Sequence, residues 1–251
     1  MTDDTTQGTE ASNNRPVALV TGAGSGIGRA VCEHLAREAN GRHRLVLVGR
    51  RADALAETGS ALGTEGDDWV ALPTDIADPD AASGLVDRAV RTLGRLDAVV
   101  NNAGWTPMKP VWAHTPSDVA SIMGVNTIGP VLITIAALQH FREQGAGRIV
   151  QVSSMAAGDP FPGLSVYGGA KAALNTLTKG IANELDEGSP IKAFCVAPGA
   201  VETELLRSII DADTLPTDAC LTPDDVAAVI NDCIAGRRDA DHGSTIWLAS
   251  S

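Results

Sequence analysis

Short apolar runs rich in β-branched residues alternate with longer amphipathic segments along most of the chain. Most of the short runs are apolar throughout, a pattern typical of strands that are buried on both faces of a parallel sheet. The longer segments have helical periodicity. The predicted strands are 17–21, 45–49, 69–73, 97–101, 148–153, 191–197 and 244–248. The predicted helices are 26–39, 52–64, 79–94, 117–143, 165–187 and 223–235.

This strand–helix alternation predicts an α/β fold of the Rossmann type, a doubly wound parallel sheet with helices on both faces. The last helix has a clear start, with Thr222 as the N-cap and Pro223 in the first position. We find no internal repeat and no interior linker. We therefore expect one catalytic domain over 15–251, preceded by a disordered acidic tail at 1–14.

Composition narrows the class of protein. The chain has 251 residues with 44% apolar and 20% charged positions, which is ordinary for a globular protein. Its net charge of −12 makes nucleic acid and anionic membrane surfaces poor partners. We find no apolar run of the ~20 residues that a membrane helix needs, and the first residues do not resemble a signal peptide. These features predict a cytoplasmic protein, and the scattered Cys and His residues predict no metal site.

A glycine-rich turn follows the first predicted strand and precedes a helix. Its sequence, Thr21-Gly-Ala-Gly-Ser-Gly-Ile-Gly28, spaces the glycines as G-x-x-x-G-x-G, with one more glycine inside. Glycines let the backbone approach a pyrophosphate, and the N-terminus of the helix offers free N–H groups to the phosphates. A glycine cluster alone is also compatible with a flexible loop, but its position favours nucleotide binding.

The second predicted strand ends in Gly49-Arg50-Arg51, where a dinucleotide fold that binds NAD usually carries an acidic residue. Guanidinium groups pair with phosphate in a bidentate manner. This predicts that Arg50, and secondarily Arg51, binds the 2′-phosphate of NADP(H), which would then be preferred over NAD(H). The alternative is a pair of solvated arginines.

Tyr167 and Lys171 stand at positions i and i+4 of a predicted helix and so share one face. A phenol has an ordinary pKa of about 10 and is a poor acid or base at neutral pH. A nearby ammonium group lowers that pKa, so we expect Lys171 to activate Tyr167 for proton transfer. Taken alone, the pair is also compatible with two unrelated side chains on a surface helix.

Asn126 lies four positions before Pro130 in the predicted helix 117–143. Proline has no N–H, so the carbonyl of Asn126 loses its helical partner and a kink is expected there. A free carbonyl in a buried cleft needs another partner, such as a water molecule. An ordinary helix kink is the alternative.

Taken together, these motifs resemble the short-chain dehydrogenase/reductase family in its single-domain form of about 250 residues. The resemblance runs from about residue 16 to the C-terminus. It rests on the glycine-rich turn at 21–28, Asp75-Ile76, the NNAG turn at 101–104, Asn126, Ser154, Tyr167 with Lys171, and Pro198-Gly199 followed by Val201 and Thr203. It implies a seven-stranded parallel sheet and NAD(P)-dependent interconversion of carbonyls and alcohols.

The resemblance also implies roles for individual residues. Tyr167 would donate the proton, Lys171 would support it, Ser154 rather than Ser153 would bind the substrate oxygen, and the carbonyl of Asn126 would hold a relay water. Asp75 would bind the adenine amino group, the turn after the fourth strand would lie against the adenine ribose, and 198–203 would hold the nicotinamide side. The implied cofactor-binding set is Gly22, Ser25, Gly26, Ile27, Gly28, Arg50, Arg51, Asp75, Ile76, Asn102, Ala103, Gly104, Tyr167, Lys171, Pro198, Gly199, Val201 and Thr203.

The expected partner is a small carbonyl or alcohol, because apolar residues dominate the three segments that should line the pocket. Lys109 and Arg207 are the isolated cations there. The function expected is that of an NADP-dependent carbonyl reductase or alcohol dehydrogenase. A 3-oxoacyl-thioester reductase and a non-catalytic NADP(H) sensor are the alternatives. The helices 117–143 and 165–187 are apolar over more than one face, which predicts a homo-oligomer, expected to be a tetramer as is common in the family.

Overall fold

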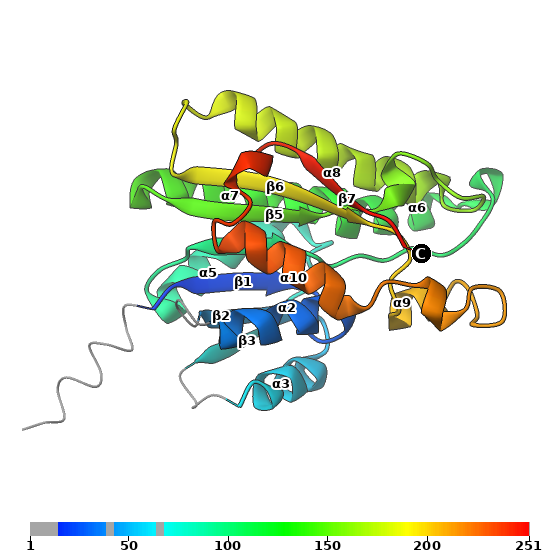
Figure 1. The fold of residues 1–251 in the computed structure, drawn as a ribbon, viewed down its shortest axis with the longest axis horizontal. Helices are drawn as coiled ribbons and strands as arrows, with labels where there is room; N and C mark the ends of the chain where they lie inside the picture. The colour runs from blue at the N-terminus through cyan, green and yellow to red at the C-terminus, as the bar shows by residue number, and fades with distance from the viewer. Residues whose placement is uncertain (1–14, 39–42, 64–67, 251) are drawn as a thin grey trace, which may run out of the picture.

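The computed structural model describes residues 15–38, 43–63 and 68–250. The predicted tail at 1–14 lies outside these ranges. The seven strands form one fully parallel sheet in the order β3-β2-β1-β4-β5-β6-β7 (Figure 1). The strands are β1 (Val17–Thr21), β2 (Arg44–Gly49), β3 (Trp69–Pro73), β4 (Ala98–Asn101), β5 (Gly147–Val152), β6 (Ile191–Pro198) and β7 (Thr245–Leu248). The predicted Rossmann-type architecture is confirmed.

Helices cover both faces of this sheet because successive strand residues point to opposite sides. Ala18 and Val20 pack with the layer that contains α2 and α10, whereas Val17 and Leu19 pack with the layer that contains α5 and α7. Figure 1 shows α2 and α10 side by side on the first face. The helices are α2 (Gly26–Arg37), α3 (Ala52–Ala61), α4 (Pro79–Ser83), α5 (Leu85–Leu93), α6 (Pro116–Met123), α7 (Gly129–Gln144), α8 (Ser165–Glu184), α9 (Glu204–Arg207) and α10 (Pro223–Ile234).

The strands match the predicted runs to within one residue at each end, whereas some helices differ. The segment 79–94 divides at Gly84, whose backbone (φ −84°, ψ −1°) ends α4 before α5 begins. The segment 117–143 contains a π-helical stretch, η2 (Gly124–Ile128), between α6 and α7. Helix α10 begins as predicted, with Thr222 and Asp225 forming a capping box.

The continuous helical segment Pro116–Gln144 is long and apolar enough to cross a membrane by length and composition alone. The sequence-based statement that no run reaches that length therefore needs correction. The apolar residues have another explanation in this fold, because Ile133, Ala137 and Phe141 pack against the sheet. A helix that covers a sheet passes the same test of composition.

The strand order reverses between β1 and β4, which are neighbours in the sheet although two strands separate them in the chain. Ligands of open α/β sheets bind in the crevice beyond the carboxyl ends of the strands at such a reversal. The glycine-rich turn follows β1, and the NNAG turn ends β4. The topology therefore brings these two segments to one place.

Candidate active site

The turn between β1 and α2 lies closely against the turn after β4. Gly22 and Gly26 have φ values of 70° and 50°, which favour glycine. A Cβ on Gly22 would lie 2.8 Å from Nδ2 of Asn102, and a Cβ on Gly28 would lie 2.2 Å from the carbonyl oxygen of Gly22. Side chains larger than hydrogen are thus excluded at both positions. Ile27 points the other way and packs against the core.

The hydroxyl of Thr21 joins the two turns. Its Oγ1 accepts hydrogen bonds from the backbone N–H groups of Asn102 and Ala103, each at 3.0 Å, and donates to the carbonyl of Val100 at 3.4 Å. Nδ2 of Asn102 donates in return to the carbonyl of Thr21 at 2.9 Å. Ser25 occupies the N-cap of α2, and its side chain makes no capping hydrogen bond. The first N–H groups of α2 thus donate no hydrogen bond to the N-cap side chain.

A cavity of about 190 Å³ opens between these turns and the end of β2. Asp75 lies on its wall, with Oδ1 accepting a hydrogen bond from the N–H of Ala77 at 3.0 Å. The structure thus brings together many of the cofactor-binding residues implied by the sequence. Those on the wall are Gly22, Ser25, Arg50, Arg51, Asp75, Ile76, Ala103 and Gly104, and they are joined by Gly24, Thr74, Trp105 and Val125, which the sequence did not single out for this site.

The two arginines after β2 differ in their surroundings. Nη2 of Arg51 lies 3.7 Å from Oε2 of Glu204, at the start of α9 on the opposite side of the cleft. Both side chains are exposed. No ion pair within the described ranges involves Arg50. Arg50 is therefore the guanidinium that has no carboxylate competing for it.

The segment after β6 faces the glycine-rich turn from the other side. The N–H of Gly199 donates to the carbonyl of Leu248 at 2.8 Å, which continues the pairing of Pro198 in β6 with β7. Thr203 caps α9, and a Cβ on Gly26 would lie 3.0 Å from Cγ2 of Thr203. The side chain of Val201 is buried in the core, so any ligand would meet its backbone.

Ser154, Tyr167 and Lys171 meet at the carboxyl end of β5. The hydroxyl of Ser154 accepts a hydrogen bond from the N–H of Ala156 at 3.2 Å, and it lies near enough to the phenol of Tyr167 to lower the pKa of that group. Nζ of Lys171 donates to the carbonyl of Val152 at 2.8 Å and lies 5.8 Å from the centre of the Tyr167 ring. Ser153 points away and is buried. The opposite orientations follow from the alternation of side chains along a strand.

The pKa of Tyr167 differs from the sequence-based expectation. Burial raises it to about 12, and the hydrogen bond from Ser154 opposes this rise. The expected lowering by Lys171 is therefore wrong in sign for the protein chain by itself. Burial lowers the pKa of Lys171 to about 8, because the residue is only 2% exposed. Desolvation disfavours the charged form of both groups, and here it outweighs their proximity.

Asn126 lies in the π-helical stretch η2 and is fully buried. Pro130 cannot donate to its carbonyl, and the wider turn places the N–H of Gly129 on the carbonyl of Gly124. The expected kink thus takes the form of a π turn. The side chain also has a role that the sequence did not reveal: Nδ2 donates to the carbonyls of Trp105 and Ile122 at 2.7 and 2.8 Å, and Oδ1 accepts from the N–H of Trp105 at 3.3 Å.

Arg29 and Thr58 are two further residues that sequence reasoning missed. Nη2 of Arg29 donates to the carbonyl of Gly24 at 2.9 Å, and its Nε donates to Oγ1 of Thr58 at 3.1 Å. Thr58 donates to the carbonyl of Ala23 at 3.0 Å. These hydrogen bonds hold the glycine-rich turn against α3. Arg29 directly follows the turn in the sequence and could have been considered for this reason, whereas the sequence contained no signal for Thr58.

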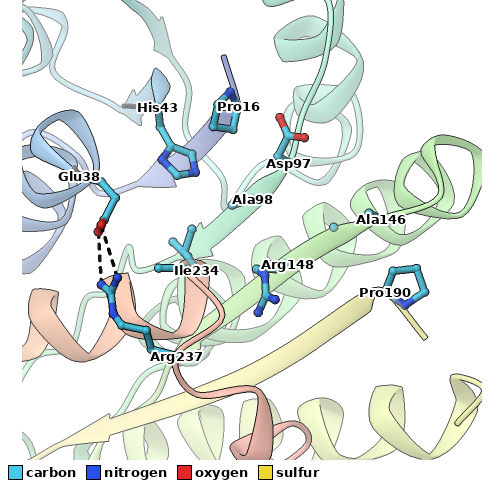
Figure 2. Close-up of a pocket in the computed structure, with 12 residues that line it drawn as sticks. Pro16, Glu38, His43, Asp97, Ala98, Ala146, Arg148, Pro190, Ile234 and Arg237 are labelled. Atoms are coloured by element: carbon cyan, nitrogen blue, oxygen red, sulfur yellow. Dashed lines mark hydrogen bonds and ion pairs between the residues drawn. The ribbon is translucent and has the colours of Figure 1, made fainter. Parts of the chain in front are cut away.

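A larger hollow of about 420 Å³ lies near the amino ends of the strands, away from this site (Figure 2). Its charged groups are engaged: Arg148 pairs with Asp239, Arg237 pairs with Glu38, and Asp97 pairs with Arg95. Among the described residues, no group of three or more His, Cys, Asp and Glu side chains could hold a metal ion. The chemistry therefore points to the carboxyl end of the sheet.

Comparisons with known proteins agree with this geometry. Residues 16–214 match the short chain dehydrogenase family. An uncharacterized oxidoreductase from Staphylococcus saprophyticus is 34% identical over 94% of this chain and 96% of its own length. A 3-ketoacyl-(acyl-carrier-protein) reductase from Brucella melitensis, solved with NADH, superposes with a TM-score of 0.84 at 29% identity over 93% of this chain and 96% of its own. A short chain dehydrogenase from Burkholderia cenocepacia, solved with NADP, gives 0.82 at 29% identity over 94% and 96%.

The fold and the matched region define a short-chain dehydrogenase, and the chain belongs to that family. The protein is accordingly an NAD(P)-dependent oxidoreductase, as the sequence predicted. The residues present fit a nicotinamide cofactor, because Gly22 and Gly28 form a cradle that a Cβ would fill and Asp75 and Arg50 line the adjoining cavity.

The adjacent glycines of α8 offer a matched pair of substitutions. A Cβ on Gly168 would lie 2.4 Å from the carbonyl oxygen of Ala156, whereas a Cβ on Gly169 would meet nothing within 4 Å. Gly168→Ala should lower the free energy of unfolding by about 1–3 kcal/mol and reduce turnover, because α8 must move away from the turn after Ser154. Gly169→Ala should raise the free energy of unfolding by about 0.5–1 kcal/mol. Urea unfolding of both variants checks this, and equal effects would contradict the packing.

The buried amine of Lys171 predicts a pH dependence of stability. Between its folded pKa of about 8 and its unfolded pKa of about 10.4, the unfolded state binds more protons, so the free energy of unfolding rises with pH. The shift of Lys171 contributes roughly 3 kcal/mol to the free energy of unfolding across that window. Buried cysteines and Tyr167 contribute with the opposite sign, so the quantity to measure is the difference between wild type and Lys171→Met. Parallel stability curves for the two proteins would show that the amine titrates normally.

Proposed function

We propose that this enzyme is an NADP-dependent carbonyl reductase that interconverts an apolar ketone or aldehyde and its alcohol. The observation that carries the proposal is the cluster of Ser154, Tyr167 and Lys171 beside the glycine-rich turn. Gly104 joins the two parts, because a Cβ there would lie 3.5 Å from Nζ of Lys171 and 3.1 Å from Oδ1 of Asn126.

A bound nicotinamide supplies the hydride in the direction of reduction. The hydroxyl of Tyr167 then donates its proton to the carbonyl oxygen of the substrate, and Ser154 donates a hydrogen bond to the same oxygen. The raised pKa of Tyr167 keeps the phenol protonated at neutral pH, which suits a proton donor. Lys171, with a pKa near 8, is placed to return a proton to the site, and the carbonyl of Asn126 is our candidate for holding the relay water.

Exposed apolar side chains in the segments that follow β4 and β5 favour an apolar substrate. Trp105, Met108 and Phe161 are 37%, 47% and 69% exposed. The backbone N–H of Lys109 donates to the carbonyl of Gly163 at 3.1 Å, which joins the two segments. The two isolated cations are engaged, because Lys109 pairs with Asp118 at 2.8 Å and Arg207 pairs with Glu202. No strong anchor is thus free for a carboxylate or phosphate at these positions.

Reduction of a 3-oxoacyl thioester is the second candidate, favoured by the likeness to the Brucella melitensis reductase. A carrier-bound thioester would have to dock beside the catalytic cluster on a chain of net charge −12. Acidic carrier proteins dock on basic surfaces, and the negative charge of this chain disfavours such docking. Free carbonyls are therefore the better first substrates to assay, with an N-acetylcysteamine thioester of acetoacetate as the direct comparison.

Replacing Tyr167 with Phe tests the catalytic assignment. The change removes the proton donor and leaves the ring, so kcat should fall by about 10²–10⁴-fold while the Kd for NADPH changes little. Stopped-flow and steady-state oxidation of NADPH with a panel of ketones and aldehydes measure this. A Tyr167→Phe enzyme that keeps full turnover would overturn the proposed mechanism.

Arg50 is the basis for the proposed preference for NADP(H). A charge-assisted contact with the 2′-phosphate is worth about 1.5–3 kcal/mol, or roughly ten- to a hundredfold in kcat/KM over NADH. Arg50→Asp should reverse that preference. Arg51→Gln is the matched control and should have a smaller effect, because Arg51 faces Glu204. Equal efficiency of the unmodified enzyme with both cofactors would contradict the assignment.

We also propose that the protein is a homo-oligomer, most simply a tetramer. Val119, Ile128 and Ile135 lie along the α6–α7 segment and are 39%, 45% and 48% exposed. Apolar side chains at this exposure are expected to be covered by another surface. Light scattering at micromolar concentration should give a multiple of 25.8 kDa. A monomeric mass would contradict this proposal. The proposed cytoplasmic location follows from the sequence argument alone.

A further inference from the structure

Two hydroxyl groups outside α8 donate hydrogen bonds to consecutive backbone carbonyls of that helix. Oγ1 of Thr127, in η2, donates to the carbonyl of Ala170 at 2.9 Å. Oγ of Ser153, at the end of β5, donates to the carbonyl of Lys171 at 3.1 Å. Both carbonyls lie within a continuous helix, where the helical ladder uses only one of the two lone pairs of each oxygen. The second lone pair is thus available to another element.

Each donor is the immediate neighbour in sequence of a proposed catalytic residue. Thr127 follows Asn126, and Ser153 precedes Ser154. The two carbonyls belong to the helical turn that carries Lys171, and Tyr167 lies one turn before it. The hydrogen bonds therefore join the three elements that supply the site: η2, β5 and α8.

The direction of these bonds matters for the position of α8. Apolar packing of residues such as Leu174 and Ile181 is non-directional and leaves a helix free to rotate or slide slightly over a sheet. Hydrogen bonds weaken steeply away from their preferred angle. Two bonds that reach the same turn from different elements restrict both motions, and the bond from Nζ of Lys171 to the carbonyl of Val152 adds a third restraint from β5.

We propose that Thr127 and Ser153 are positioning residues, whose hydroxyls set the distances among Asn126, Ser154, Tyr167 and Lys171. This proposal rests on the catalytic roles given under Proposed function. A displacement of about 1 Å in an active site can cost about a hundredfold in rate. Loss of either hydroxyl should therefore reduce kcat by about ten- to a hundredfold, with the Kd for NADPH within about threefold of wild type.

The chain offers matched controls for ordinary loss of a buried hydroxyl. Thr127→Val removes the hydroxyl and keeps the shape, whereas Thr127→Ser keeps the hydroxyl and should retain wild-type behaviour. Thr178→Val removes a fully buried hydroxyl from α8 itself, where Oγ1 bonds the carbonyl of Leu174 in its own helix at 2.9 Å. Ser153→Ala removes the second tether. Urea unfolding should show comparable losses of stability for Thr127→Val and Thr178→Val.

Tyr167 is the only tyrosine in the chain, so tyrosine labelled with ¹³C at Cζ gives one protein resonance. Its chemical shift and its pH titration report the surroundings of the phenol without any substrate. We expect Thr127→Val and Ser153→Ala to move this resonance, and Thr127→Ser and Thr178→Val to leave it in place. Wild type and these four variants are assayed for NADPH oxidation with 9,10-phenanthrenequinone, together with Tyr167→Phe.

The outcomes separate this proposal from the one on which it rests. If Tyr167→Phe is inactive and the tether variants match Thr178→Val in both resonance and kcat, the positioning role is refuted and the catalytic assignment stands. If Tyr167→Phe retains turnover, the catalytic assignment fails whatever the tethers do. A moved resonance with reduced kcat in Thr127→Val, restored in Thr127→Ser, supports the proposal.

Discussion

The buried amine of Lys171 is the constraint on which the rest of the site depends. Lys171 is 2% exposed, so its amine loses most of its hydration, and the carbonyl of Val152 at 2.8 Å replaces one of the lost water contacts. Desolvation of this kind lowers the pKa of Lys171 toward neutrality and raises that of the neighbouring phenol. In the mechanism that we propose, a tyrosine that stays protonated beside an amine that can gain or lose a proton near pH 8 forms the proton-transfer pair.

Close backbone packing joins the glycine-rich turn after β1 to the turn after β4. Thr21 ties the glycine-rich turn to Asn102 and Ala103, so β1 and β4 deliver their following turns as one unit. The same unit continues to Lys171 through Gly104, where a side chain would meet the amine. In the proposed function, cofactor binding and proton transfer therefore rest on adjoining backbone, and a change in one turn is expected to reach both.

The exposed pair of Arg51 and Glu204 joins the end of β2 to the start of α9. Surface ion pairs of this type contribute little to stability. Its importance lies in the contrast with Arg50, whose guanidinium has no such competitor among the described residues. Two arginines that are adjacent in sequence therefore have different prospects of meeting a phosphate, which the sequence could not distinguish on charge alone.

The sequence by itself determined the architecture, because fully apolar strand runs and helical periodicity have few ways to bury their surfaces other than a doubly wound parallel sheet. It also determined which turns converge, since the carboxyl ends of parallel strands meet at one edge. Only the tertiary structure decided the sign of the Tyr167 pKa shift, the π turn at Asn126 and the hydroxyl bonds of Thr127 and Ser153. These depend on burial and on distances between residues remote in the chain. Periodicity records which face of an element is buried, but it does not record how completely an amine is desolvated or which carbonyl a hydroxyl reaches.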